Sequence, residues 1–135
     1  MDDEKEILKD LLIDDEEVKK QLSSLVSKAK NIFQIQKNDG KIIFKNFQKL
    51  KNPDRICALL MGKKFAKKLG LNVKDVMTIT EIGDELGILS TTLSSPMGDL
   101  IKNGYVIKDG KNYEIAYNRL PEIFEDFFSG VNDES

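Results

Sequence analysis

The segment Thr78-Ile-Thr-Glu-Ile-Gly-Asp-Glu-Leu-Gly87 opens the part of the sequence that decides the fold. Thr78 and, three residues later, Glu81 form a capping box, and Gly87 closes the segment, so the pattern predicts a short helix. A turn and a second helix are expected over residues 88–103. The segment Gly104-Tyr-Val-Ile-Lys-Asp-Gly-Lys-Asn-Tyr-Glu-Ile-Ala-Tyr117 then predicts two strands joined by Asp109-Gly110 as a type I′ turn.

Apolar spacing within this segment predicts which side of each helix faces the core. Leu86 follows Ile82 by one helical turn, so both are expected to be buried. The turn after Gly87 is expected to be left-handed, since glycine tolerates positive φ, and Ile88 is expected to plug it. The residues expected to seat the second helix against the core are Leu93, Met97, Leu100 and Ile101.

With this order of elements, the chain resembles the winged helix-turn-helix transcriptional regulators of bacteria and archaea, broadly the MarR and ArsR families. The resemblance is close over residues 78–117 and extends, with the preceding helix, over residues 53–117. It implies an α+β fold, mostly α, with the hairpin as a wing and the second helix in the major groove of DNA. It also implies a cytoplasmic protein and a homodimer, because paired half-sites call for two-fold symmetry.

The resemblance also places the outward face of the second helix against DNA. Hydroxyl groups there discriminate weakly between bases, whereas small side chains let the helix backbone approach closely. Lysines beside the wing turn are candidates for phosphate contact, although lysines are also ordinary in any exposed hairpin. The outward positions of the helix are Thr91, Ser94, Ser95, Gly98 and Lys102, and the expected DNA-binding residues are Ser90, Thr91, Ser94, Ser95, Lys102, Lys108, Lys111 and Asn112.

Two positions depart from the resembled pattern. Leu89 stands where serine or threonine usually caps the second helix, and Ser90 is an alternative cap that would shift the helix start by one residue. Pro96 lies inside the expected helix, where proline removes one hydrogen bond and clashes with the preceding turn. Either the helix is kinked at Pro96, or Ser95 caps a shorter helix that starts there.

Residues 1–52 predict an N-terminal extension of helices and a hairpin. Asp14 and Glu17 form a second capping-box pattern at the start of an amphipathic helix. Asn38-Asp-Gly40, between two apolar runs, predicts a hairpin over residues 32–45. The helix stripe comprises Val18, Leu22, Leu25, Val26, Ala29 and Phe33, after a shorter stripe of Ile7, Leu8, Leu11 and Leu12.

Five lysines in and after this hairpin allow two interpretations. They form a phosphate-facing patch, or they keep an edge strand soluble, which is the more common role of such lysines. The residues are Lys37, Lys41, Lys45, Lys49 and Lys51.

A long helix is expected from Asp54 to Leu69, because Pro53 suits a first turn and Gly70 can end it. Most of its apolar residues form one stripe, but Leu60 and Met61 lie off it, so the helix is expected to pack on two sides. Four lysines are expected to cluster on the remaining surface. The stripe comprises Ala58, Leu59, Gly62, Phe65, Ala66 and Leu69, and the lysines are Lys63, Lys64, Lys67 and Lys68.

Residues 118–135 predict a C-terminal amphipathic helix, with Pro121 in its first turn, and a frayed tail from Gly130 to Ser135. A stripe this apolar must be covered, either by its own chain or by its counterpart in a dimer. The chain thus divides into the extension, a winged helix-turn-helix over residues 53–117, and this C-terminal part. The stripe comprises Leu120, Ile123, Phe124, Phe127 and Phe128.

The composition fits one globular domain with appendages, since 40% of the 135 residues are hydrophobic and 33% are charged. No apolar run approaches the length that spans a bilayer, and no secretory signal pattern is present. The net charge of −2 does not favour nucleic acid, but the acidic residues concentrate at both ends and leave the middle mildly basic. Arg55 and Arg119 are the two arginines, so bidentate reading of guanine is scarce.

Several kinds of catalytic site are excluded by residue content. The chain has no histidine, which removes histidine bases, nucleophile pairs that use histidine, and histidine metal ligands. Its one cysteine, Cys57, cannot build a zinc site or an internal disulfide, and its apolar neighbours predict a buried thiol in a reducing cytosol. Met61-Gly-Lys-Lys64 lacks the upstream glycine of a phosphate-binding loop. We therefore expect neither enzymatic activity nor a cofactor or metal.

Two functions follow from the sequence. The first is a DNA-binding transcriptional regulator that uses the winged helix-turn-helix, with double-stranded DNA and a second copy of the chain as partners. The second is a winged helix that serves as a protein–protein interaction module in a larger complex, without direct DNA readout. The acidic composition and the absence of arginine from the outward helix face favour the second. The resemblance favours the first.

Overall fold

The computed structural model describes residues 15–129, together with Glu4 and Leu8. Its fold is α+β and mostly helical, with two small antiparallel hairpins, as the sequence predicted. The capping box at Asp14, most of the short stripe before it, and the tail from Gly130 lie outside the described residues. The elements are α2 (Asp15–Ala29), β1 (Phe33–Ile35), β2 (Ile42–Phe44), η2 (Phe47–Lys49), α3 (Asn52–Lys68), α4 (Ile79–Leu86), α5 (Ser90–Lys102), β3 (Val106–Asp109), β4 (Asn112–Ile115), η3 (Tyr117–Arg119) and α6 (Leu120–Phe128).

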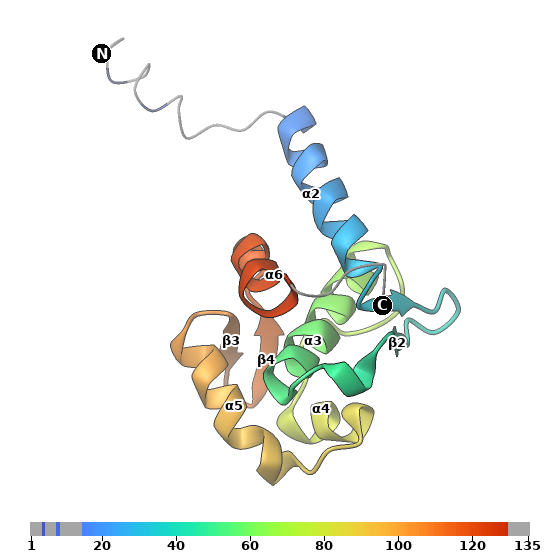
Figure 1. Ribbon diagram of the computed structural model, residues 1–135, viewed down its shortest axis with the longest axis vertical. Helices are drawn as coiled ribbons and strands as arrows, with labels where there is room; N and C mark the ends of the chain where they lie inside the picture. The colour runs from blue at the N-terminus through green and yellow to red at the C-terminus, as the bar shows by residue number, and fades with distance from the viewer. Residues whose placement is uncertain (1–3, 5–7, 9–14, 130–135) are drawn as a thin grey trace.

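Helix α3 lies at the centre of the fold (Figure 1). It contacts both hairpins and helices α4, α5 and α6, and every residue from Ile56 to Gly62 is buried. The expected packing on more than one side is confirmed. Gly62 is needed there, because a Cβ atom at this position would lie 2.6 Å from the Cδ1 atom of Ile42 in β2.

The C-terminal end of α3 differs from the prediction at one apolar position. The sequence placed Leu69 on the buried stripe, but its side chain is 70% exposed. Leu69 is the C-cap residue, and the chain leaves the helix through Gly70 with φ +87°. The stripe therefore runs one turn beyond the elements that cover it, and Leu69 borders a pocket instead.

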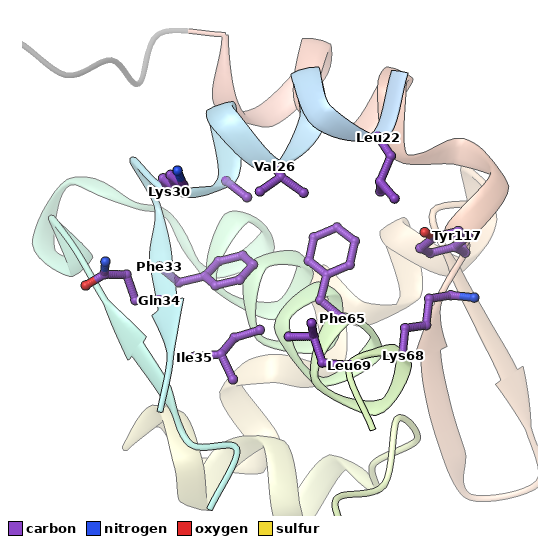
Figure 2. A pocket seen from close by; sticks show the side chains of 11 residues that line it. Leu22, Val26, Lys30, Phe33, Gln34, Ile35, Phe65, Lys68, Leu69 and Tyr117 are labelled. Atoms are coloured by element: carbon purple, nitrogen blue, oxygen red, sulfur yellow. The ribbon is translucent and has the colours of Figure 1, made fainter. Parts of the chain in front are cut away.

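The N-terminal hairpin pairs Phe33 with Phe44 and Ile35 with Ile42, which confirms the predicted turn between them. Phe33 lies in β1 and not on the α2 stripe where the helical spacing also placed it. Its ring is buried, and Figure 2 shows it directed from β1 toward Phe65 of α3. Helix α2 itself extends away from the rest of the fold (Figure 1), so one side of its stripe stays partly exposed, with Leu22 and Val26 each 39% exposed.

Helix α5 begins at Ser90, with Leu89 at its N-cap, and runs unbroken to Lys102. The shorter helix that would start at Pro96 is therefore wrong. The missing amide of Pro96 deprives the Thr92 carbonyl of its helical partner, but Thr92 is exposed and water can satisfy that oxygen. Leu93, Met97 and Leu100 are buried as predicted.

The second hairpin turns one residue later than predicted. Its register pairs Val106 with Ile115 and Asp109 with Asn112, so Gly110 and Lys111 form the two-residue turn. Gly110 has a φ of +64°, whereas neither Asp109 nor Lys111 has a positive φ, and a type I′ turn needs two such residues. Val106 and Ile115 are both buried, so the shared core face sets this register.

Helix α6 folds back on its own chain, as one of the two alternatives from the sequence has it. It contacts α2 and α3 and buries Leu120, Ile123, Phe124 and Phe128, while Phe127 is half-buried and packs on Tyr105. The apolar stripe is thus covered within one chain. In the part of the chain that the structure describes, no helix combines the length and apolar character needed to cross a membrane.

Candidate nucleic-acid interface

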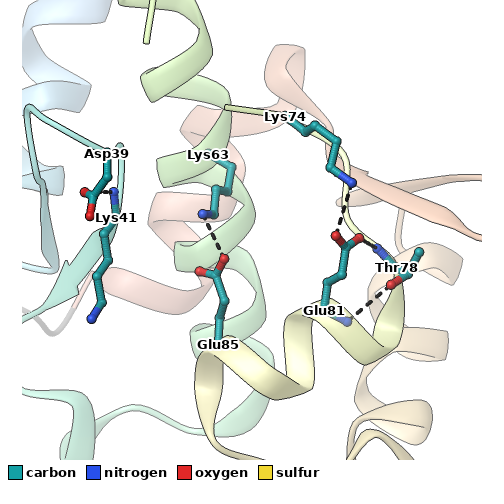
Figure 3. Close-up of polar contacts among 7 residues, drawn as sticks. All are labelled: Asp39, Lys41, Lys63, Lys74, Thr78, Glu81 and Glu85. Carbon is teal, nitrogen blue, oxygen red and sulfur yellow. Dashed lines mark hydrogen bonds and ion pairs between the residues drawn. The ribbon is translucent and has the colours of Figure 1, made fainter. Parts of the chain in front are cut away.

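Helix α4 is fixed at its start by a reciprocal cap (Figure 3). The amide of Glu81 donates to the Thr78 hydroxyl at 3.2 Å, and the Thr78 amide donates to the Glu81 carboxylate at 2.9 Å. Lys74 also donates to that carboxylate, at 3.1 Å. The hydrogen bond from the Thr78 backbone is the main cause of the lowered pKa of Glu81, and Lys74 adds to it. The predicted capping box is therefore confirmed.

The turn between α4 and α5 is tight because two glycines allow it. Gly87 adopts a left-handed conformation with φ +69°, as expected. Gly83 was not singled out by the sequence analysis. A Cβ atom there would lie 2.6 Å from the Ile88 carbonyl oxygen, and the Ile88 amide donates to the Gly83 carbonyl at 3.0 Å. A glycine one turn before the helix end is the sequence signal that could have revealed this contact.

The outward face of α5 carries the side chains that the sequence placed there. Lys102 and the small residues before it are exposed, and Ser90 is half-buried. The Ser94 hydroxyl donates to the Ser90 carbonyl at 3.3 Å, so its proton is engaged within the helix. The exposed small residues are Thr91, Ser94, Ser95 and Gly98.

Gly98 is the position on this face that packing does not explain. A Cβ atom there would meet nothing within 4 Å among the described residues, and its φ is an ordinary helical one. Glycine in a helix interior costs about 0.5–1 kcal/mol relative to alanine. The helix therefore carries a destabilising residue that no contact in the described residues requires, at the middle of its outward face.

The N-terminus of α5 is open to an external acceptor. Leu89 holds the N-cap position without any side-chain hydrogen bond, so the N-cap side chain does not occupy the first-turn amides of Ser90 and Thr91. Free amides at a helix start attract anions, since they add to the positive end of the helix dipole. Leu89 itself is 75% exposed, which the sequence analysis did not predict.

The hairpin β3–β4 presents three of the predicted residues to solvent. Lys108, Lys111 and Asn112 are exposed, and the Lys108 ammonium lies 5.7 Å from the centre of the Tyr113 ring. Ile107, on the same strand as Lys108, is 48% exposed. The hairpin thus offers both cationic and apolar side chains.

Charges around α5 and the hairpin are balanced. Exposed lysines at 102, 108 and 111 are matched by three exposed aspartates that the sequence analysis did not weigh, one each on α4, α5 and β3. The helical and strand spacing of the sequence predicts that these aspartates lie on the exposed faces of their elements. The aspartates are Asp84, Asp99 and Asp109.

Both arginines are engaged within the chain. Arg55 donates to the Phe47 carbonyl at 3.0 and 3.3 Å and lies 4.0 Å from the centre of the Phe47 ring. Arg119 forms an ion pair with Glu122 and donates to the Asn103 carbonyl. Each guanidinium group therefore makes polar contacts within the chain.

Two of the lysines expected on the surface of α3 are instead held in ion pairs. Lys63 lies 2.9 Å from Glu85 of α4 (Figure 3), and its side chain is only 11% exposed. Lys64 lies between Asp75 and Glu114, at 2.9 and 2.8 Å. The expected cluster of four surface lysines is therefore wrong, because acidic groups distant in the sequence draw two of them inward.

The five lysines at the first hairpin are all exposed, on its loop and over the segment that leads into α3. Near the turn, the Lys41 amide donates to the Asp39 carboxylate at 3.0 Å (Figure 3), which leaves the Lys41 ammonium toward solvent. Both strands of this two-stranded sheet are edges. The two interpretations of these lysines therefore stay open.

Within the described residues, no group of three or more cysteine, histidine, aspartate or glutamate side chains is arranged to hold a metal ion. Cys57 is completely buried, as predicted. Burial, with a smaller contribution from Asp54, raises the pKa of its thiol far above the ordinary value. The thiol is therefore a core group and not a nucleophile.

Comparison of the chain with models of known protein families, with curated proteins and with solved structures finds no significant match.

Proposed function

We propose that α4, α5 and the β3–β4 hairpin form a winged helix-turn-helix that binds double-stranded DNA, and that the protein is a transcriptional regulator. The observation that supports this most strongly is the outward face of α5. It is exposed along the helix and carries small side chains. At Gly98 it also has open space, because no described residue packs closely enough there to require glycine. A face of this kind suits a helix whose backbone lies close to a groove of the DNA duplex.

In this proposal the contacts to DNA are of two kinds. Ser90 and Thr91 direct helix-start amides and hydroxyls at phosphate or base edges, and Ser95 contributes a further hydroxyl. Lys102 at the end of the helix, with Lys108 and Lys111 on the wing, neutralise phosphates. Phosphate and backbone contacts thus dominate, and base discrimination by α5 alone is weak.

The regulator is proposed to act as a homodimer, because paired half-sites impose two-fold symmetry. The apolar stripe of α6 is already covered by α2 and α3 of the same chain. We therefore propose a dimer surface away from this stripe. Sedimentation equilibrium with and without DNA measures the stoichiometry directly.

The decisive experiment is fluorescence anisotropy of labelled genomic fragments at several salt concentrations. In the proposed dimer, three phosphate-neutralising lysines per protomer give roughly six phosphate contacts, so the slope of log affinity against log salt is roughly −5.4, which corresponds to about a 2,000-fold loss between 50 and 200 mM salt. Lys102→Glu is expected to reduce binding strongly with the fold intact. Lys20→Glu, an exposed lysine on α2, is the matched control and is expected to leave binding almost unchanged.

An affinity that stays flat with salt, or binding lost equally in both lysine variants, contradicts the proposal. Far-UV circular dichroism of each variant separates lost binding from lost folding. Ser95→Glu provides a second probe, since a carboxylate placed on the outward face of α5 would repel phosphate.

A protein partner is the second candidate for the same surface. Two observations favour it: the lysines and aspartates on this surface balance, and two large apolar side chains are exposed beside them, Leu89 at 75% and Ile107 at 48%. In that case Lys102→Glu and Ser95→Glu have no effect on any DNA affinity, because none exists. Instead, Leu89→Asp would abolish assembly with the partner chain, as measured by co-purification from the source cells.

A further inference from the structure

An apolar pocket lies at the C-terminal end of α2, where this helix meets β1, the end of α3 and η3 (Figure 2). Its volume is about 480 Å³, within the range of roughly 300–1,000 Å³ that is usual for small-molecule sites. Aliphatic side chains, among them Leu22, Val26 and Leu69, line it from α2 and α3. These three are also among the large apolar side chains that the described residues leave exposed.

Three aromatic rings form a continuous wall of the pocket. The centres of the Phe33 and Phe65 rings are 6.4 Å apart, and those of Phe65 and Tyr117 are 6.2 Å apart at an interplanar angle of 83°. Contacts of this geometry hold each ring in place, so the wall is preformed. A preformed apolar wall favours an apolar ligand body without a large ordering cost.

The charged side chains that line the pocket are both cationic. Lys30 stands at one end, and Lys68 stands at the other, where its ammonium lies 4.4 Å from the centre of the Tyr117 ring (Figure 2). No aspartate or glutamate is among the described residues that line the pocket, and neither lysine forms an ion pair with another described residue. The pocket therefore combines an apolar interior with positive charge at both ends.

We propose that this pocket binds an amphipathic anion, namely a small molecule with an apolar body and one terminal carboxylate or similar acidic group. The body lies along the aromatic wall, and the acidic group pairs with a lysine at either end, so two opposite orientations are available. The pocket residues belong to α2, β1, α3 and η3, except Lys30 and Leu69, which directly follow α2 and α3. None lies on α4, α5 or the wing, so this proposal does not depend on DNA binding.

The test measures binding of decanoate to the full-length protein by isothermal titration calorimetry, below the micelle concentration of the ligand. Decanol is the neutral probe of the same chain length, and decyltrimethylammonium is the cationic one. Decanoate is expected to bind best and the cation worst. An exposed ion pair contributes up to about fivefold in affinity, so decanoate should exceed decanol by roughly that factor.

Two matched pairs of variants test the role of the lysines. Lys30→Met with Lys68→Met removes both cations of the pocket, and the decanoate affinity should fall about fivefold to that of decanol. Each single substitution leaves one orientation intact, so it should lower the affinity only about twofold. Lys28→Met with Lys67→Met removes neighbouring exposed lysines that do not line the pocket, and should leave it unchanged.

A third variant tests the apolar body. Val26 lines the pocket and is partly exposed, so the indole of Val26→Trp should fit without disturbing the core. It should occupy the pocket and abolish binding of decanoate and decanol alike. Thermal unfolding of this variant shows whether the fold persists. The proposal is overturned if decanol binds as tightly as decanoate, or if the control double variant loses as much affinity as the pocket one. Absence of decanoate binding also overturns it.

Discussion

The ammonium of Lys64, on α3, lies 2.8 Å from the Glu114 carboxylate on β4, fifty residues further along the chain. The same ammonium lies 2.9 Å from Asp75, in the segment that leads into α4. Met77, two residues later, pairs with Tyr113 of β4 through two backbone hydrogen bonds of 2.8 and 2.9 Å. This arrangement ties the hairpin to the central helix and sets its position beside α5.

Replacing Lys64 by methionine is expected to destabilise the fold by about 2 kcal/mol, because two partly buried carboxylates would face each other without a cation. The side chain of Lys64 is only 13% exposed. Urea unfolding followed by circular dichroism measures the change. The control is Lys67→Met, an exposed lysine one turn away, for which a change within about 0.5 kcal/mol is expected. An equal loss in both variants would show that the ion pairs do not stabilise the hairpin.

Acidic pH should weaken the ion pairs that Lys64 forms with Asp75 and Glu114. The hydrogen bond from Lys64 is the main cause of the lowered pKa of Asp75. Burial lowers the pKa of Lys64, but the hydrogen bonds that its ammonium donates to Glu114 and Asp75 outweigh burial, so the pKa of Lys64 is raised. A lowered carboxylate pKa stabilises the fold above the ordinary aspartate value of about 3.9, and this contribution is lost as the pH falls through the lowered pKa. The difference in unfolding free energy between the protein and its Asp75→Asn variant should therefore shrink below about pH 4. A difference that stays constant from pH 6 to pH 3 would refute the assignment.

The hydroxyl of Thr78, which caps α4, is expected to stabilise the fold. Thr78→Ala removes the acceptor of the Glu81 amide and should cost about 1 kcal/mol of unfolding free energy. Thr80, an exposed threonine in the first turn of the same helix, is the matched control, and its replacement by alanine should be neutral or slightly stabilising. Urea unfolding of both variants decides the matter. If the Thr80 variant lost more stability than the Thr78 variant, the cap would not be the stabilising contact.

Most of what the sequence predicted correctly depends on local patterns. Thr78 and Glu81 are three residues apart, Gly87 needs only its own backbone conformation, and Leu93, Met97 and Leu100 are neighbours on one helix face. Such signals act within one or two turns of chain. They identified the elements and the faces that α5 and α6 bury.

What the sequence did not predict depends on contacts between distant segments. Lys64 appeared to be a surface lysine because its partners lie 11 and 50 residues away. Leu69 appeared to be a core residue because helical spacing cannot show where the covering elements end. Helical propensity could not decide whether the chain continues through Pro96 or starts a helix there, since packing of the flanking residues Leu93 and Met97 decides it.

Cys57 offers a test of the core without any change of sequence. Its side chain is completely buried and burial raises the pKa of its thiol, so it should not react with a disulfide reagent in the folded state at pH 8. The thiol is expected to become reactive in parallel with unfolding by urea, which monitors global opening of the fold. Rapid reaction of the native protein would mean that α3 opens locally and is not the stable centre of the fold.

Two glycines of the helix-turn-helix region should respond to alanine in opposite ways. Gly98→Ala is expected to stabilise the protein by about 0.5–1 kcal/mol, because its Cβ atom would meet no described residue within 4 Å and alanine is the better helix former. Gly83→Ala is expected to destabilise it by about 1–3 kcal/mol, because its Cβ atom would lie 2.6 Å from a backbone oxygen that cannot easily move.

The same pair separates the stability of α5 from its proposed function. If the backbone of α5 approaches DNA at Gly98, the methyl group of Gly98→Ala should weaken DNA binding in a protein that is more stable than before. Urea unfolding and anisotropy on one preparation measure both quantities. Higher stability with unchanged DNA affinity would mean that DNA does not approach α5 at this position, and would direct attention to the wing lysines Lys108 and Lys111. Lower stability would mean that Gly98 has a structural role that its open surroundings do not reveal.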